Sequence, residues 1–455
     1  MRECQVAVRT LINSKRASFP RLYFAPQYEL LKLLSTAGRP REAFARFIPL
    51  VFPGMGRLLY DGDSPKGEGD AAGAAADGPS TTTAVAISGG RSARRQAIDD
   101  ASSDATLTIA GWSSSTGGAE RVPAENSVAV EGTIIECLQR LEVAQKVTMR
   151  KQVERSLKRM PKQQLTDWLL EEFPAAFEAG EAAMSFDVAA ATKQAGIRKR
   201  VAARYADSAQ TASITMQVER CYEVAEALNS VGRGRTDAMG KFVDRIIKSV
   251  ESLAKLARKQ LRPADVQRIG TMIAFETHYR DLCSWLHQRK VASAGAFEWQ
   301  LQLRFIAIDP VAPPQPAKAE RVLGSDDDSG SDSEESEEYA MHWAPVGKDI
   351  CIESCGVRCL YGYEYRGNSQ RLVLTPVAER AMLSMLNSLK NSRGSAAIGP
   401  TRAVDTVNEL TTQLGRACFT LPCWDGLGYS AAELIENALL GLASGTGWWA
   451  CISNI

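Results

Sequence analysis

Histidine is scarce in this chain, since His278, His287 and His342 are the only three among 455 residues. The ten cysteines include no CxxC pair, although Cys351, Cys355 and Cys359 follow one another at four-residue spacing. Structural zinc sites usually combine two closely spaced ligand pairs, so we expect no metal site. No Ser/His/Asp or Cys/His catalytic arrangement can be assembled either, and we expect His278 to be packed on a helix. The cysteines fit better as reduced thiols in a cytosolic protein.

Charge imbalance and long apolar runs are also missing. The chain has 54 Lys and Arg residues against 53 Asp and Glu residues, which gives a net charge of +1. This balance offers no general attraction to nucleic acid or to a membrane surface. No apolar run is long enough to cross a bilayer, and the N-terminus has no signal-peptide pattern. We therefore expect a cytoplasmic protein with no nucleic-acid partner and no membrane partner.

Helical periodicity dominates what is present. Residues 132–160 place Ile134, Leu138, Leu141 and Val147 at three-to-four spacing, with charged residues on the other side. Residues 216–228 and 239–261 are further predicted helices, and Pro263 stands at the expected first position of another. The pattern predicts a mainly α protein.

Two segments interrupt these helices. Residues 61–130 are rich in Gly, Ala, Ser and Thr, which predicts a low-complexity disordered insertion. Residues 324–345 contain an acidic serine-rich block at 325–338, which repels itself and predicts a disordered acidic loop. Its serines are flanked by acids, as in sites of acidophilic kinases, and phosphate would add negative charge. A solvated loop without any partner is the simpler interpretation.

The C-terminal part carries the most specific motifs. Residues 361–376 read YGYEYRGNSQRLVLTP, Gly399-Pro400 follows, and CWDGLGY and WACISNI stand at 423–429 and 449–455. These resemble the start of the first AAA+ module of a dynein heavy chain, which reads roughly YGYEYLGNxxRLVITPLTDR, GPAGTGKTET, NCSDGLDY and AWxCFDEFNRI. We expect strands at 419–423 and 448–452 and a helix at 431–442, in an open α/β sheet. Because an AAA+ module needs more strands, this P-loop NTPase-like module would be incomplete, with an uncovered sheet edge.

The N-terminal part resembles the linker of the same family. KRASFPRLYF at 15–24 and ELLKLLS at 29–35 match the order of a linker run, and AGAFEWQLQLR at 294–304 resembles its FxWxxQLR motif. The resemblance implies a helical linker arm in which some residues are core and others, namely Gln300, Gln302 and Arg304, face the polar side. The implied core residues are Phe19, Tyr23, Phe24, Leu30, Leu31, Leu34, Trp299 and Leu303.

The predicted domains follow from these matches. Residues 1–60 form the first part of the linker, 61–130 the insertion, 131–323 the later linker, 324–345 the acidic loop, and 346–455 the truncated first AAA+ module. The resemblance also implies a trace of the family's short β-region at 118–130.

The resemblance also implies nucleotide contacts. The segment beside the adenine would be Leu372, Val373, Leu374, Thr375, Pro376 and Val377. Gly399 and Pro400 would open the phosphate loop, and Thr406 could hold its hydroxyl position. A short hydrophobic strand before a helix is the alternative interpretation of residues 372–377.

Several parts of that nucleotide site are altered. A P-loop needs a Lys on the phosphates, but residues 399–415 contain none, and Asp405 falls near its place. Val404 has a branched Cβ where the loop needs glycine-like conformations. Ser453 and Asn454 stand where the family has its two carboxylates. We assign no catalytic residue, and we expect ATP and magnesium, the cofactors of the family, to bind weakly or not at all.

Three interpretations follow. The first is an axonemal-like dynein heavy-chain fragment of a microtubule minus-end-directed motor, with other dynein chains and microtubules as partners. Its location would be the cytoskeleton, including the axoneme of a cilium or flagellum. The second is a stand-alone pseudo-motor binding module that docks on dynein parts without hydrolysis. The third is a non-catalytic scaffold regulated through the acidic tract.

Overall fold

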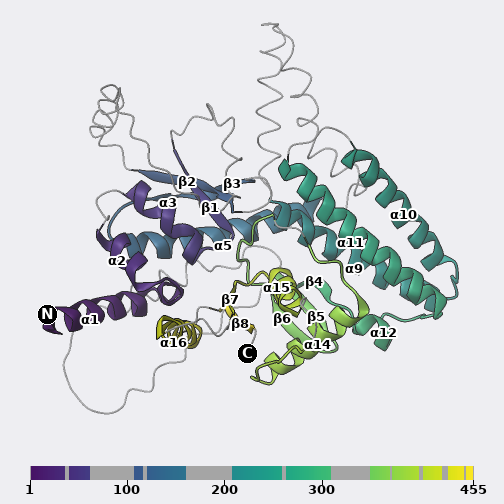
Figure 1. The fold of residues 1–455 in the computed structure, drawn as a ribbon. Helices are drawn as coiled ribbons and strands as arrows, with labels where there is room; N and C mark the ends of the chain where they lie inside the picture. The colour runs from purple at the N-terminus through teal and green to yellow at the C-terminus, as the bar shows by residue number, and fades with distance from the viewer. Residues whose placement is uncertain are drawn as a thin grey trace, which may run out of the picture.

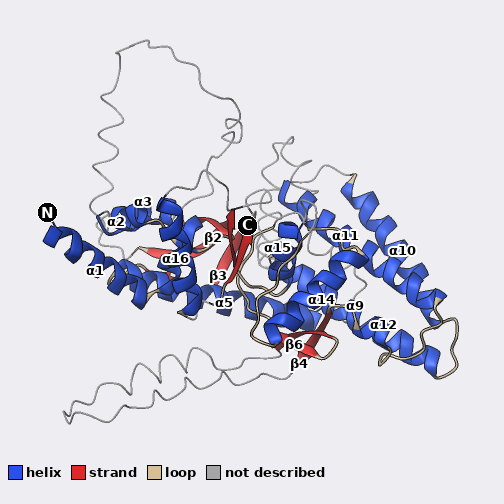
Figure 2. Cartoon of the chain, turned by 60° about the horizontal axis from the view of Figure 1, so that its bottom comes forward, coloured by secondary structure: helices blue, strands red, loops and turns tan. Residues whose placement is uncertain are grey.

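The computed structural model describes residues 2–35, 40–61, 107–115, 120–159, 208–258, 263–308, 349–368, 371–398, 403–422, 429–444 and 447–453. Residues 62–106 of the predicted insertion, the predicted acidic loop at 324–345, and Gly399 and Pro400 lie outside these ranges. The described part is elongated, with α1 (Arg2–Ser18) at one end and α10 (Ala238–Ala257) at the other (Figure 1, Figure 2).

Three helical elements follow α1, namely η1 (Pro20–Phe24), α2 (Gln27–Ser35) and α3 (Pro40–Val51). Pro20 begins η1 because its fixed φ suits a first helical position. Phe19, Phe24 and Leu30 are buried, as predicted. The prediction for Leu31 is wrong: it is 38% exposed, and Leu33 is buried in its place. Leu33 lies three residues after Leu30 and so shares its helix face.

A three-stranded antiparallel sheet of β1 (Met55–Tyr60), β2 (Thr108–Ser114) and β3 (Arg121–Ala129) packs beside these helices (Figure 1). The prediction of disorder is therefore wrong for residues 107–115, while β3 agrees with the trace of a β-region expected at 118–130. Ile109, Trp112, Val122 and Val128 are all buried. They give the two strands an apolar face that the Ser- and Gly-rich composition concealed.

Four long helices form most of the remaining linker-like region that the structure describes, namely α5 (Ile134–Arg159), α9 (Ala209–Gly232), α10 and α11 (Pro263–Gln288). The short helix α12 (Phe297–Gln300) follows them. Each long helix overlaps a predicted one, so the mainly helical class is confirmed. Ser208 caps α9, since its side chain accepts a hydrogen bond from the Thr211 backbone N–H. Pro263 begins α11, as expected.

A second antiparallel sheet joins the two halves of the sequence. Its strands are β4 (Arg304–Ile308), β5 (Asp349–Ser354) and β6 (Val357–Leu360), and β4 pairs with β5. Trp299 is buried, as predicted, but so are Gln302 and Arg304, so the predicted polar face is wrong for these two. Burial of Arg304 is offset by an ion pair with Glu353 at 3.2 Å.

The C-terminal elements are α14 (Pro376–Lys390), α15 (Ala403–Gln413), β7 (Cys418–Pro422), α16 (Tyr429–Ala443) and β8 (Trp449–Ser453). Strands β7 and β8 pair in parallel, which confirms the two strands and the intervening helix expected at 419–452. In the described part of the chain, this sheet has two strands. The same part contains no helix long and apolar enough to span a bilayer.

His278 on α11 is half-buried and packs edge-on against the Tyr279 ring. Burial lowers its pKa from 6.5 to about 4, although Asp281 works in the opposite direction. At a pH between about 4 and 6.5, the imidazole is protonated in the unfolded chain and neutral in the folded chain. Stability from neutral His278 is therefore present above pH 6.5 and is lost as the pH falls toward 4.

The free energy of unfolding should fall as the pH falls, and His278 should account for at most roughly 3 kcal/mol of that fall. We expect His278→Gln to remove this contribution. The measurement is denaturant unfolding at several pH values, read as the difference between the variant and the unmodified chain. This difference is needed because burial raises the pKa of neighbouring Glu379, which acts with the opposite sign. His287→Gln, at an exposed position, is the control. Equal pH profiles for His278→Gln and the unmodified chain would contradict the prediction.

Candidate nucleotide site

The predicted adenine segment is an open stretch of chain rather than a strand. Residues 371–375 have no regular secondary structure, so the alternative strand interpretation is wrong. Val373 and Val377 are 68% and 76% exposed, and Leu372 and Leu374 are half-buried. Thr375 caps α14 by accepting a hydrogen bond from the Ala378 N–H at 3.3 Å, and Pro376 is the first helical residue. The segment thus presents valines outward from a fixed helix start.

Helix α15 is tied to this segment through the buried carboxylate of Glu409. The backbone N–H of Leu372 donates to Glu409 Oε2 at 3.2 Å, and Arg371 Nε lies 3.5 Å from Glu409 Oε1. Thr406 lies one turn earlier on the same helix and is only 8% exposed. The structure therefore brings the predicted adenine segment and the Thr406 helix together, while Gly399 and Pro400 are outside the described residues.

The charge at the start of α15 is unsuited to a phosphate. A helix N-terminus attracts anions because its free N–H groups carry partial positive charge. Here Asp405 supplies a carboxylate in the first turn, and no Lys or Arg occurs anywhere in Ala403–Gln413. The described residues of α15 therefore supply a negative side chain and no positive one near the start of this helix.

The two positions expected to hold acids beside magnesium are Ser453 and Asn454, which carry no charge. Ser453 ends β8, and Asn454 lies outside the described residues. Within the described ranges, no group of three or more His, Cys, Asp and Glu side chains could hold a metal.

The segment 361–368, just before the adenine segment, runs through the interior. Tyr361, Tyr363 and Tyr365 are each 7% exposed or less. Tyr361 OH accepts from Gln210 at 2.6 Å, Tyr363 OH donates to Asp349 at 3.3 Å, and Tyr365 OH donates to Glu120 at 3.1 Å. Burial raises the pKa of all three phenols, so they remain neutral.

The backbone of this segment is also constrained. Tyr363 has φ of 53°, a left-handed conformation that bulky residues rarely adopt. Two glycines make room for the segment: a Cβ on Gly54 would lie 2.0 Å from the Tyr365 carbonyl oxygen, and one on Gly415 would lie 2.3 Å from the Tyr361 ring. The left-handed Tyr363 is held by its hydroxyl, which accepts from the Ile350 N–H at 3.2 Å.

Arg21 of η1 forms a buried ionic centre with the same segment. Its guanidinium donates to both Glu364 oxygens at 2.6 and 2.7 Å, and to Glu142 of α5 at 2.9 Å. Burial acts to lower the pKa of Arg21, but the carboxylates of Glu364 and Glu142 outweigh it and raise the pKa. The guanidinium also lies over the rings of Phe52 and Trp448, at 4.8 and 5.4 Å from their centroids.

The comparisons with known proteins match both ends of the chain. Residues 361–455 match the family model for the hydrolytic ATP binding site of dynein motor region, and residues 1–156 match that for dynein heavy chain, N-terminal region 2. The chain is 22% identical to dynein axonemal heavy chain 11 of Sus scrofa and to the ciliary dynein beta chain of Tripneustes gratilla, over 453 residues, or 99% of its length. It is 21% identical over its full length to the flagellar outer arm dynein beta chain of Chlamydomonas reinhardtii.

This chain belongs to the dynein heavy chains. It spans 8% of the length of each of these three relatives.

The two matched regions of this dynein heavy chain meet at Arg21 and Glu364. Arg21 belongs to the region matched by the N-terminal model, and Glu364 to the region matched by the ATP-site model. Trp448, directly before β8, adds a second contact, because its ring stacks on Phe24 of η1 at 4.5 Å and an interplanar angle of 8°. The linker-like and module-like parts therefore share one buried core.

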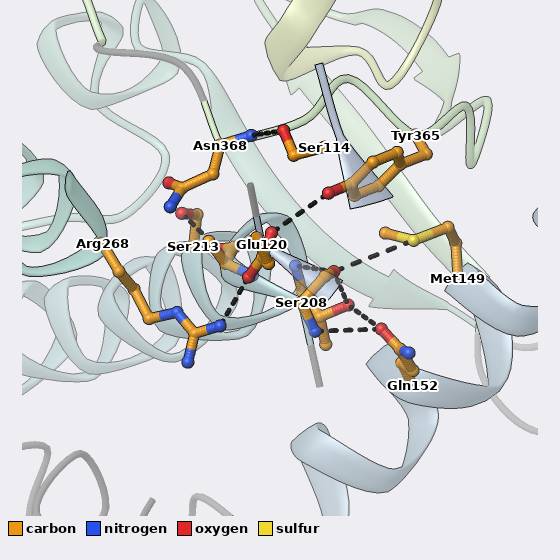
Figure 3. A network of polar contacts seen from close by, with 11 residues as sticks. Ser114, Glu120, Met149, Gln152, Ser208, Ser213, Arg268, Tyr365 and Asn368 are labelled. Carbon is orange, nitrogen blue, oxygen red and sulfur yellow. Dashed lines mark hydrogen bonds and ion pairs between the residues drawn. The ribbon is translucent and has the colours of Figure 1, made fainter. Parts of the chain in front are cut away.

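A second polar centre joins these parts around Glu120 (Figure 3). Glu120 Oε1 accepts from the Ala209 N–H at 2.7 Å and pairs with Arg268 of α11, and Glu120 Oε2 accepts from Tyr365. Figure 3 shows the Ser208 cap of α9 beside this carboxylate, bonded to Gln152 of α5. Sequence reasoning missed Arg21, Glu120 and Glu364. Arg21 and Glu364 stand among aromatic and apolar residues, but Glu120 follows a Gly- and Ser-rich stretch that carries no such signal.

Proposed function

We propose that this chain forms the junction between the linker and the first AAA+ module of an axonemal-type dynein heavy chain, and that its module does not hydrolyse ATP by itself. The observation that carries the proposal is a contrast between two sites. The Arg21–Glu364 junction is a two-bond ion pair in a buried setting, whereas the nucleotide site has Asp405 in the first turn of α15 and no cation on that helix.

Hydrolysis needs a phosphate clamp, a metal and a positioned water acting together. In this chain the clamp lacks its ammonium group, and Ser453 and Asn454 replace the two carboxylates. A hydroxyl and an amide bear no charge, so they neither balance magnesium nor act as an effective base. The role left to the module is structural, as a partner surface for the linker.

The setting is a microtubule-based dynein complex. The relatives are named as axonemal, ciliary and flagellar outer arm dyneins. We infer that this chain works with other dynein chains on microtubules, in the cytoskeleton of a cilium or flagellum. Minus-end-directed movement would belong to the complete motor.

Residual nucleotide affinity would reside in the adenine segment, residues 372–377. Its outward valines offer apolar surface for a base, but no side chain on α15 carries a positive charge for the phosphates. Calorimetric titration with magnesium–ATP should give weak or undetectable heat. Micromolar binding would contradict this expectation.

We expect no magnesium-dependent phosphate release above blank from the purified chain. A matched variant replaces the six residues 399–404 with the eight-residue family sequence GPAGTGKT. It also carries the substitutions Ser453→Asp and Asn454→Glu. Restoring the clamp should raise ATP affinity measured by calorimetry, because the added Lys and loop N–H groups favour the phosphates. Turnover by the unmodified chain that disappears in Thr406→Ala would overturn the proposal.

A further inference from the structure

A small cavity lies where α9, α11 and α15 meet the 361–371 segment. Its volume is about 20 Å³, and its lining includes Thr271 of α11, Thr412 and Gln413 of α15, and Asn368. A cavity must offer roughly 10–15 Å³ by this kind of measure before it can hold one water molecule. The space is therefore large enough for one water and too small for an organic ligand.

The Gln413 amide has a fixed orientation in this cavity wall. Its Nε2 donates to Glu409 Oε1 at 3.0 Å, and a carboxylate can only accept, so nitrogen must be the atom on that side. The other amide atom, Oε1, is buried and has no hydrogen-bond partner among the described residues. Gln413 as a whole is 2% exposed, so bulk solvent does not supply the missing donor.

Thr271 contributes a second unsatisfied group to the same cavity. Its Oγ1 is buried and, within the described part of the chain, bonds neither to its own helix nor to a neighbour. The residue is 5% exposed. A hydroxyl can donate or accept, so it is compatible with either orientation of a shared partner. Two buried polar atoms without partners on one small cavity are unusual, because native proteins satisfy most such groups.

We propose that this cavity is a binding site for one structural water, which donates a hydrogen bond to Gln413 Oε1 and exchanges a second with Thr271 Oγ1. The water links the last turn of α15 to α11. It thereby connects the helix that follows the phosphate loop with the linker, independently of any nucleotide. Through Glu409 the same link extends to the backbone of Leu372.

The test is a double-mutant cycle on the full chain with Thr271→Val and Gln413→Met, read by denaturant unfolding. Each single variant leaves one partner unsatisfied, so each should raise the unfolding equilibrium constant about tenfold. The second substitution should cost clearly less once the first is present, because both act through one water. A high-resolution crystal structure of the unmodified chain should show water density bonded to both atoms, absent in Thr271→Val.

Two controls keep the outcome specific. Thr412→Val removes a hydroxyl from the same cavity wall, but that hydroxyl already donates to the Asn408 carbonyl at 2.7 Å, so the water should stay. Thr271→Ser keeps the hydroxyl and should retain both the density and the coupling. Additive effects of the two single variants, or a direct Thr271–Gln413 hydrogen bond without intervening density, would overturn the proposal.

Discussion

Arg21→Ala should lower the free energy of unfolding by about 3–5 kcal/mol, the usual cost of breaking a buried ion pair from one side. The side chain of Glu364 is 4% exposed, so the variant leaves a carboxylate in the interior without its cation. The stacking of the guanidinium on Phe52 and Trp448 is lost as well. Denaturant unfolding followed by tryptophan fluorescence measures the effect and also reports on Trp448.

Two comparisons separate this effect from a general loss of charge. Arg280→Ala breaks a pair with Asp281 in which the two side chains are 37% and 65% exposed, and exposed pairs contribute only about 0–1 kcal/mol. Arg21→Met combined with Glu364→Leu removes both charges, so it should cost less than the sum of the single variants. An Arg21→Ala chain as stable as Arg280→Ala would show that the junction does not depend on this centre.

The helices were predictable because their signal is local. An amphipathic helix repeats its apolar residues every three to four positions, and α10, observed at Ala238–Ala257 against a predicted 239–261, carries such a repeat. Cap and proline signals placed helix starts equally well, as at Pro263. Strands β7 and β8 were also predictable, since each is a short apolar run beside turn residues.

The polar centres could not be predicted because their partners are distant along the chain. Arg21 and Glu364 are 343 residues apart, and Glu120 and Tyr365 are 245 apart. A single sequence shows that a charged residue stands among aromatics, but it does not show which residue balances it. The same limit explains β2 and β3: their apolar face becomes visible only when the strands pair, whereas average composition indicated disorder.

The nucleotide contacts of residues 372–377 and Thr406 stay a prediction. The structure shows that this segment lies beside the helix that carries Thr406 and that Glu409 holds the two together. The resemblance did not indicate that Val373 and Val377 would face outward, since exposure depends on what packs against the segment. Burial of Thr406 likewise follows from the packing of α15 and not from its place in a motif.

Glu120→Ala is the second substitution expected to have a large effect, again about 3–5 kcal/mol in the free energy of unfolding. It leaves the guanidinium of Arg268, whose side chain is 9% exposed, without its carboxylate. It also removes the acceptor for the Ala209 N–H at the first turn of α9 and for the Tyr365 hydroxyl. Because these donors come from α9, α11 and the 361–368 segment, the loss should spread beyond β3.

Hydrogen exchange distinguishes this centre from a merely local defect. In Glu120→Ala, amides in the first turns of α9 and around residues 361–368 should exchange faster. Those of α10, which lies apart from β3 in Figure 1, should change less. Glu120→Gln retains one acceptor oxygen and should lie between the alanine variant and the unmodified chain. Glu125→Ala is the matched control, since the Glu125 side chain is 25% exposed and its partner Arg155 is 43% exposed. If Glu120→Ala and Glu125→Ala destabilised the chain equally, Glu120 would contribute no more to stability than a half-exposed carboxylate does. The two matched regions would then be joined chiefly through Arg21.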